Sequence, residues 1–154
     1  MSVEGLKRMY ELNHYAIGLN ARDLTHEQSL LGPGPQGNCA NWVVGHIVTN
    51  RGYILEMLGE KPIWEEAATA PYQRGSGPLP KSAAKPFPEI LEALDRSQER
   101  LAAGLSRLSD QDLGPDDVKE SLGRKLAFFQ FHEAYHAGQL GLLRRVAGKE
   151  GAIK

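Results

Sequence analysis

Two histidines four residues apart carry the strongest chemical signal in the sequence. His132 and His136 lie within LAFFQFHEAYHAGQL (126–140), a segment without proline. Residues at positions i and i+4 of a helix share one face, so the two imidazoles would lie side by side. Neutral imidazole is a good ligand for Zn²⁺ and for Ni²⁺. The spacing therefore favours a shared metal ion.

A third histidine, His46, is expected in the middle of another helix, with Val43 and Asn50 at helical spacing around it. We expect all three histidines to face the protein interior, where an unpaired imidazole costs about 1–3 kcal/mol. Three protein ligands would leave coordination positions open for water or substrate, as in catalytic sites. The sequence thus predicts a metal site formed by His46, His132 and His136.

The alternative is that these histidines are hydrogen-bonded core residues, because this spacing also arises by chance in a chain with five histidines. His26 is expected to be structural. His14 is also expected to be structural, although it shares a helical stripe with Tyr10 and Ile17 and could reach the site. Gln139, on the stripe of the histidines, could hydrogen-bond the far nitrogen of a ligand imidazole. The residues expected beside the ligands are Asn50, Glu133, Gln139 and His14.

The string from His132 to His136 also reads H-E-x-x-H, the pattern of zinc peptidases, in which the glutamate is the general base. Such an enzyme needs a third ligand after the motif. Only 18 residues follow His136, they include no histidine, and Glu150 is their sole acid. Glu133 is expected about 100° around the helix from His132, toward the margin of the histidine face. A zinc peptidase is therefore a distant third interpretation.

Four tracts without proline define the elements that must position these residues. Proline costs roughly 3 kcal/mol inside a helix, and apolar residues recur at three- and four-residue spacing within each tract. We predict four helices of roughly 18–24 residues, forming an all-α four-helix bundle. The tracts are 1–32, 36–61, 89–114 and 116–154.

The connections between these helices are unequal in length. Five of the nine prolines lie between Pro71 and Pro88, which predicts a long crossover between helices two and three. Asn38 is a plausible N-cap for helix two, and Gly148 is expected to end helix four. Hydroxyl residues three positions before a polar or acidic residue indicate capping boxes, each opening a short extra turn. These pairs are Thr25 with Gln28 and Ser109 with Asp112.

Length and composition limit the class of protein. The 154 residues predict a single domain over 1–154, and a net charge of −1 argues against a nucleic-acid partner. No long apolar run indicates a signal peptide or a membrane span. One cysteine, Cys39, excludes an intrachain disulfide, and we interpret it as a small core residue. A cytoplasmic location is therefore expected.

Two segments resemble the marks of the DinB/YfiT-like superfamily: NWVVGHI (41–47) and HEAYHAGQ (132–139). The resemblance covers nearly the whole chain. It implies an up-down-down-up bundle, with His46, His132 and His136 as metal ligands beside a pocket. Members are frequently dimers, and those with understood activities include thiol-dependent transferases and isomerases. Many relatives have arginine where this chain has Ala137.

These observations lead to a functional hypothesis. We expect a bundle that binds Zn²⁺ or Ni²⁺ at three histidines and acts as a metal-dependent enzyme on a small molecule, by hydrolysis or by thiol transfer. The resemblance adds a low-molecular-weight thiol as a cofactor and a homodimer as the assembly. The competing hypothesis is a non-catalytic metal-binding or dimeric interaction bundle.

Overall fold

Helices make up all of the regular structure in residues 1–115 and 117–153, which the computed structural model describes, and no strand occurs there. This confirms the all-α prediction. Positions 116 and 154 of the predicted 1–154 domain lie outside the described residues. The long helices are α1 (Val3–Ala21), α3 (Ala40–Met57), α5 (Phe87–Leu105) and α6 (Leu122–Val146). The short ones are α2 (His26–Ser29), α4 (Glu66–Thr69) and the 3₁₀ helices η1 (Ala70–Tyr72), η2 (Lys81–Ala83) and η3 (Asp110–Leu113).

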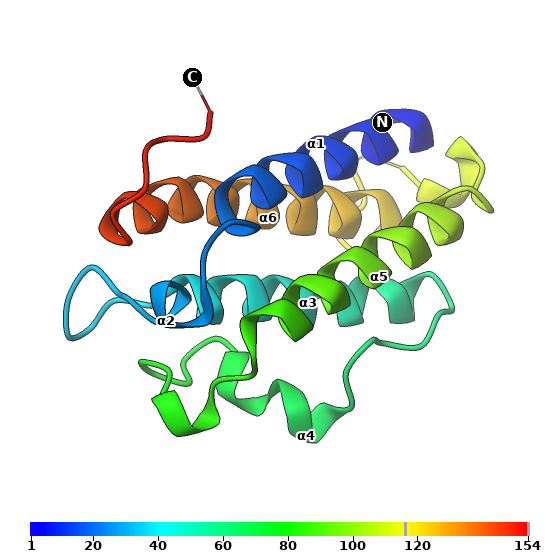
Figure 1. Ribbon diagram of the computed structural model, residues 1–154. Helices are drawn as coiled ribbons and strands as arrows, with labels where there is room; N and C mark the ends of the chain where they lie inside the picture. The colour runs from blue at the N-terminus through cyan, green and yellow to red at the C-terminus, as the bar shows by residue number, and fades with distance from the viewer. Residues whose placement is uncertain (116, 154) are drawn as a thin grey trace.

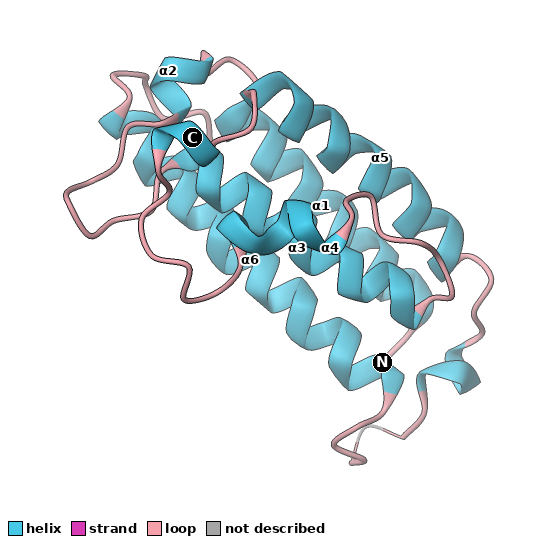
Figure 2. Ribbon diagram, turned by 90° about the horizontal axis from the view of Figure 1, so that it is seen from below, coloured by secondary structure: helices cyan, strands magenta, loops and turns pink. Residues whose placement is uncertain are grey.

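The four long helices pack along one another as a helical bundle (Figure 1). The main contacts join α3 with α5, α1 with α6, and α3 with α6. Figure 1 shows α3 and α5 running in one direction and α1 and α6 in the other. The connection from α3 to α5 carries α4, η1 and η2, and both α4 and η1 contact α3. We call residues 58–86 the crossover segment. Figure 2 shows its loops in pink, between the short helices that it carries.

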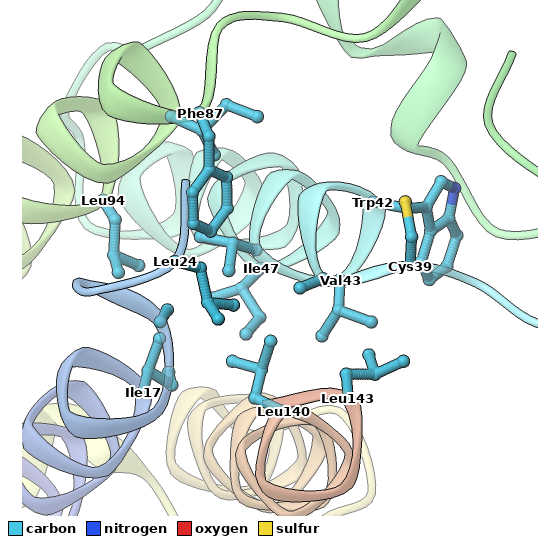
Figure 3. Packing of buried hydrophobic residues seen from close by; sticks show 14 of the residues in the cluster. Ile17, Leu24, Cys39, Trp42, Val43, Ile47, Phe87, Leu94, Leu140 and Leu143 are labelled. Atoms are coloured by element: carbon cyan, nitrogen blue, oxygen red, sulfur yellow. The ribbon is translucent and has the colours of Figure 1, made fainter. Parts of the chain in front are cut away.

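The apolar core lies between the four long helices in two clusters. In the first, side chains of α3 face those of α6, as Val43, Ile47, Leu140 and Leu143 show in Figure 3. The second lies toward the other end of α3 and includes Ile54, Leu55, Leu101 and Leu126. Cys39 is buried in the first cluster, as expected, and burial raises the pKa of its thiol. No helix in the described ranges is long and apolar enough to cross a membrane.

Local sequence signals place most helix boundaries. Both predicted capping boxes are present: Thr25 with Gln28 opens α2, and Ser109 with Asp112 opens η3. Gly148 follows the end of α6 with a φ of 78°, which glycine adopts without strain.

Two predicted helix starts differ from the structure. The N-cap of α3 is Cys39 instead of Asn38, and its side chain makes no capping bond. Helix α5 begins at Phe87 and includes Pro88 in its first turn. Proline is tolerated there because the missing N–H would have no partner within the helix.

Candidate metal centre

Three imidazoles meet between α3 and α6. The Nε2 atom of His132 lies 3.3 Å from Nε2 of His46 and 3.1 Å from Nε2 of His136. Each ring therefore offers one ligand nitrogen, and these three nitrogens lie within 4.8 Å of one another. His46 and His136 are buried and His132 is partly buried. The structure thus brings together the three histidines that the sequence singled out, in a cluster that could hold a metal ion.

Hydrogen bonds on the far side of two rings fix their tautomers. Nδ1 of His46 lies 2.6 Å from the main-chain oxygen of Tyr72, and Nδ1 of His136 lies 2.7 Å from Oε1 of Gln139. Both partners are acceptors, so each Nδ1 carries the proton and each Nε2 presents a lone pair. His132 has one Nε2 and can supply at most one N–H to its two neighbours.

The donor set therefore fits a cation. Three Nε2 atoms converge with at most one proton among them, and Nδ1 of His132 is buried without a hydrogen-bond partner in the described structure. A divalent ion that accepts nitrogen lone pairs would bind all three Nε2 atoms at once.

Burial sets the charge state of the cluster. It is the largest cause that lowers the pKa of His46 and of His136, each to about 4. The hydrogen bonds from these two rings act in the opposite direction but do not restore the usual value. Burial also lowers the pKa of His132, with smaller effects from His46 and from Arg74. All three rings are neutral at pH 7, which is the form that binds a metal.

Two aromatic residues that sequence reasoning missed hold His46 in place. Trp42 stacks on the His46 ring, with the centroids 4.6 Å apart and the planes at 12°. The indole Nε1 of Trp42 donates to Ser76 of the crossover segment at 3.0 Å. Gly45 makes room for the other residue, because a Cβ there would lie 2.2 Å from a ring carbon of Tyr72. The pattern Trp42…Gly45-His46 could have been a signal for this arrangement.

Tyr72 ties the crossover segment to α3. Its hydroxyl donates to Oδ1 of Asn41 at 3.1 Å and accepts from the backbone N–H of Lys85 at 2.8 Å. Because its main-chain oxygen is also the acceptor for His46, the fold of the crossover segment determines the orientation of that ring.

Two of the four predicted neighbours contact the histidines. Gln139 accepts from His136, as the sequence allowed. The side-chain nitrogen of Asn50 lies 3.1 Å from Nε2 of His46 and donates to the main-chain oxygen of His46 at 2.7 Å. Asn50 therefore lies at the edge of the cluster.

Glu133 belongs to a different structure, which we call the Arg51–Glu133 fork. Nε and Nη2 of Arg51 lie 2.8 and 3.0 Å from the two carboxylate oxygens of Glu133. Nη1 of Arg51 donates to Ser97 and to the main-chain oxygen of Leu94. Both charged side chains are at most 1% exposed. The prediction that Glu133 lies toward the margin of the histidine face is wrong: its side chain is fully buried, and both its oxygens are engaged by Arg51 instead of facing the histidines.

The reason is the position of the buried face of α6. Residues at the centre of that face are Leu126, Gln130, Glu133, Ala137 and Leu140, all buried. The histidines flank this face on the side of α3, whereas Phe128 and Val146 are exposed. Tyr53 on α3 is also exposed.

His14 and His26 lie outside the cluster. His14 pairs with Asp95, with Nε2 3.2 Å from Oδ1, and Arg22 binds the same carboxylate at 2.5 and 3.0 Å. Burial lowers the pKa of His14 to about 4. Nδ1 of His26 accepts from the backbone N–H of Phe87 at 3.3 Å. No described contact joins either residue to the three-histidine cluster.

The cluster opens to a small cavity of about 160 Å³. Its lining comes from α3 and from the crossover segment: His46, Thr49, Asn50, Tyr53, Gln73 and Arg74. Arg74, which sequence reasoning did not single out, is exposed at this opening.

The fold and the site define a class of protein: a helical bundle with three inward histidines from two helices and an adjoining cavity. A sequence model of the DinB superfamily matches residues 13–140, a range that contains all three histidines. The chain belongs to the DinB superfamily.

The fold is also similar to a solved structure, described as a conserved protein of Enterococcus faecalis. The TM-score is 0.70, the alignment covers 95% of this chain and 97% of the other, and the sequences are 14% identical. This likeness shows a shared fold. Among curated proteins, the sequence has no significant match.

Proposed function

We propose that this chain binds a divalent metal ion, Zn²⁺ or Ni²⁺, through His46, His132 and His136 and acts as a metal-dependent enzyme on a small molecule. The observation that carries the proposal is the convergence of three Nε2 atoms with at most one proton among them.

The chain's own residues would hold this site in a reactive geometry. Trp42 and the main-chain oxygen of Tyr72 orient His46, and Gln139 orients His136. A divalent ion held there would supply a Lewis acid that polarises a substrate group. Asn50 offers an amide at the rim, and Arg74 offers a positive charge that would attract an anionic group. We propose hydrolysis or transfer to a low-molecular-weight thiol as the reaction.

The proposal includes an assembly. Phe128, Phe131, Tyr135 and Leu142 form one stripe along α6, each more than half exposed. Exposed apolar stripes of this kind mark association surfaces. We propose that a second copy of the chain covers this stripe. Each chain would be a single-domain, up-down-down-up four-helix bundle. If the site proves inert, this face favours the alternative function, a non-catalytic metal-binding interaction bundle.

The metal proposal is tested by metal analysis of protein purified without a histidine tag. We expect about one Zn²⁺ or Ni²⁺ per chain, because three protein ligands define one site. Alanine at His46, His132 or His136 should remove most of it. His14→Ala and His26→Ala are matched controls and should retain it. Full retention in His46→Ala would overturn the three-histidine site.

The enzyme proposal is tested by turnover of a generic electrophile with a panel of small thiols, and of generic ester substrates. The wild-type protein should show a rate that His136→Ala lacks, while His26→Ala retains it. Equal rates for wild type and His136→Ala on all substrates would favour the non-catalytic bundle. An unstructured peptide should not be cleaved, because Glu133 is held by Arg51.

A further inference from the structure

A second cavity continues from the one beside the histidines. It has a volume of about 320 Å³ and lies between α3 and the crossover segment. The two cavities share three lining residues, Thr49, Tyr53 and Gln73, and therefore form one groove. Figure 2 shows α4, which contributes Glu66 and Thr69 to the lining, lying across α3. The groove extends along α3 from His46 to Glu56.

The two ends of this groove carry opposite charges. Arg74 lines the end beside the histidines, and no carboxylate in the described structure pairs with it. Glu56 and Glu66 line the other end, and neither has a basic partner among the described residues.

Two charges beside the groove have partners within the protein. Glu60 binds Arg107 at 2.8 Å, just after α3 ends. The ammonium of Lys85 lies over the Trp64 ring, 5.3 Å from the centroid. Charges left without a protein partner in a concave site are the usual means of fixing a ligand's orientation.

The middle of the groove is apolar and aromatic. Tyr53 is about half exposed, at 47%, and Trp64 is partly buried against Tyr72, with ring centroids 5.4 Å apart. Val48 and Pro62 complete this lining. Tyr53 lies between the two charged ends, because it lines both cavities.

We propose that the groove binds a small zwitterion, with its carboxylate toward Arg74 and the histidines, its ammonium toward Glu56 and Glu66, and an apolar chain against Tyr53 and Trp64. This rests on the proposed function and names its substrate class. His46 and Glu56 are ten positions apart on α3, or about 15 Å at the rise of an α-helix. A ligand bound in the reverse direction would place its carboxylate against two glutamates.

The test uses aminobutyrate, aminohexanoate and aminooctanoate, each with the amino group at the chain end, and two probes with one charge, hexanoate and hexylamine. Binding is measured by NMR titration of zinc-loaded protein and of metal-free protein, with the zinc content of each sample recorded. Exposed charge contacts change affinity by up to about fivefold each. We expect aminohexanoate or aminooctanoate to bind about fivefold more tightly than hexanoate.

Variants assign each end of the ligand. The double variant E56Q/E66Q should bind aminohexanoate and hexanoate equally, while R74Q should weaken both and leave hexylamine unchanged. The variant E92Q/E99Q removes two exposed acids of α5 and is the matched control. Equal affinity of wild type for all zwitterions and hexanoate, or no difference between E56Q/E66Q and E92Q/E99Q, would overturn the proposal.

The outcome also separates this proposal from the metal site. If the protein holds no metal but E56Q/E66Q still abolishes the preference for the ammonium group, the groove proposal stands and the metal proposal fails. If zinc is bound at full occupancy and the preference is absent, the groove proposal fails alone.

Discussion

Two polar clusters connect α3 with α6, and they differ in how completely their atoms are hydrogen-bonded. In the Arg51–Glu133 fork, three guanidinium nitrogens and both carboxylate oxygens have partners within the protein. In the three-histidine cluster, nitrogens that need donors face one another. Buried polar groups in folded proteins are almost always satisfied. The fork is therefore complete within the protein, whereas the three histidines present a donor set that could hold a metal ion.

The two clusters are also neighbours on the same two helices. Arg51 follows His46 by five residues on α3, and Glu133 follows His132 directly on α6. Because the fork is bidentate, it fixes the register of these two helices and thereby the distance between their histidines. A buried ion pair adds little net stability compared with apolar residues, so register is the property that it supplies best here.

The largest effect is expected from breaking the fork. Arg51→Met or Glu133→Leu alone should lower the free energy of unfolding by about 3–5 kcal/mol, because each leaves an uncompensated buried charge. The double variant R51M/E133L should regain most of this loss, measured by urea denaturation. If the register argument holds, the double variant will still bind zinc more weakly than wild type. Single variants as stable as wild type would contradict the role of the fork.

The next effect concerns the contact that orients His46. Gly45→Ala should cost about 1–3 kcal/mol, because its Cβ would lie 2.2 Å from the Tyr72 ring. It should also weaken zinc binding, since the carbonyl of Tyr72 moves with the ring. Gly138→Ala on α6 is the control, since a Cβ there has nothing within 4 Å, and helix propensity favours alanine. Both are measured by thermal denaturation and by chelator competition.

The pH dependence sharpens the comparison, because the buried histidines have lowered pKa values. His14, His46 and His136 have pKa values of about 4 in the folded protein, against about 6.5 when unfolded. The unfolded chain therefore binds more protons between these values, and stability falls as the pH drops from 6.5 toward 4. Metal-free protein should lose several degrees of Tm between about pH 7 and pH 5. A Tm that is constant over this range would contradict the burial of neutral imidazoles.

A smaller effect is expected from Gln139, the acceptor for His136. Gln139→Ala should lower zinc affinity about tenfold. A residue that hydrogen-bonds the other ring nitrogen of a ligand histidine typically contributes that much to metal affinity. Gln139→Glu, which keeps an acceptor at the same position, should restore it. Tyr135→Phe removes only the outer hydrogen bond to Gln139 and should leave the affinity near that of wild type. Zinc affinity unchanged in Gln139→Ala would show that His136 needs no partner.

The smallest effect is expected from an ion pair at the surface. Arg22 and Asp95 are 49% and 39% exposed, and such pairs contribute about 0–1 kcal/mol. Arg22→Gln should therefore change the free energy of unfolding far less than Arg51→Met. Similar losses in the two variants would show that burial does not distinguish these two pairs.

Features with local causes could be predicted from the sequence. Proline positions and apolar spacing predict the long helices, and the hydroxyl residues Thr25 and Ser109 predict both capping boxes. The cluster of His46 with His132 and His136 could also be predicted, because all three were expected on the inward faces of their helices. One error was local too: Glu133, expected at the margin of the histidine face, lies at the centre of the buried face of α6.

Features with non-local causes could not be predicted. Arg51 and Glu133 are 82 positions apart, and a buried arginine looks like any surface arginine in the sequence. The acceptor for His46 is a main-chain oxygen, which every residue has, so nothing in the sequence marks Tyr72 for this role. Only Gly45, whose missing side chain admits the Tyr72 ring, offers a trace of the contact.

The main-chain acceptor at Tyr72 has a thermodynamic consequence. No side-chain substitution can delete that carbonyl, so the His46 contact is lost only when the backbone of η1 departs from α3. Ion binding and local opening of the crossover segment are therefore coupled equilibria, and each must oppose the other to the same degree. A bound ion would slow amide hydrogen exchange in 70–76. By the same reciprocity, any substitution that loosens this segment would lower the affinity for the ion, even where it touches no ligand.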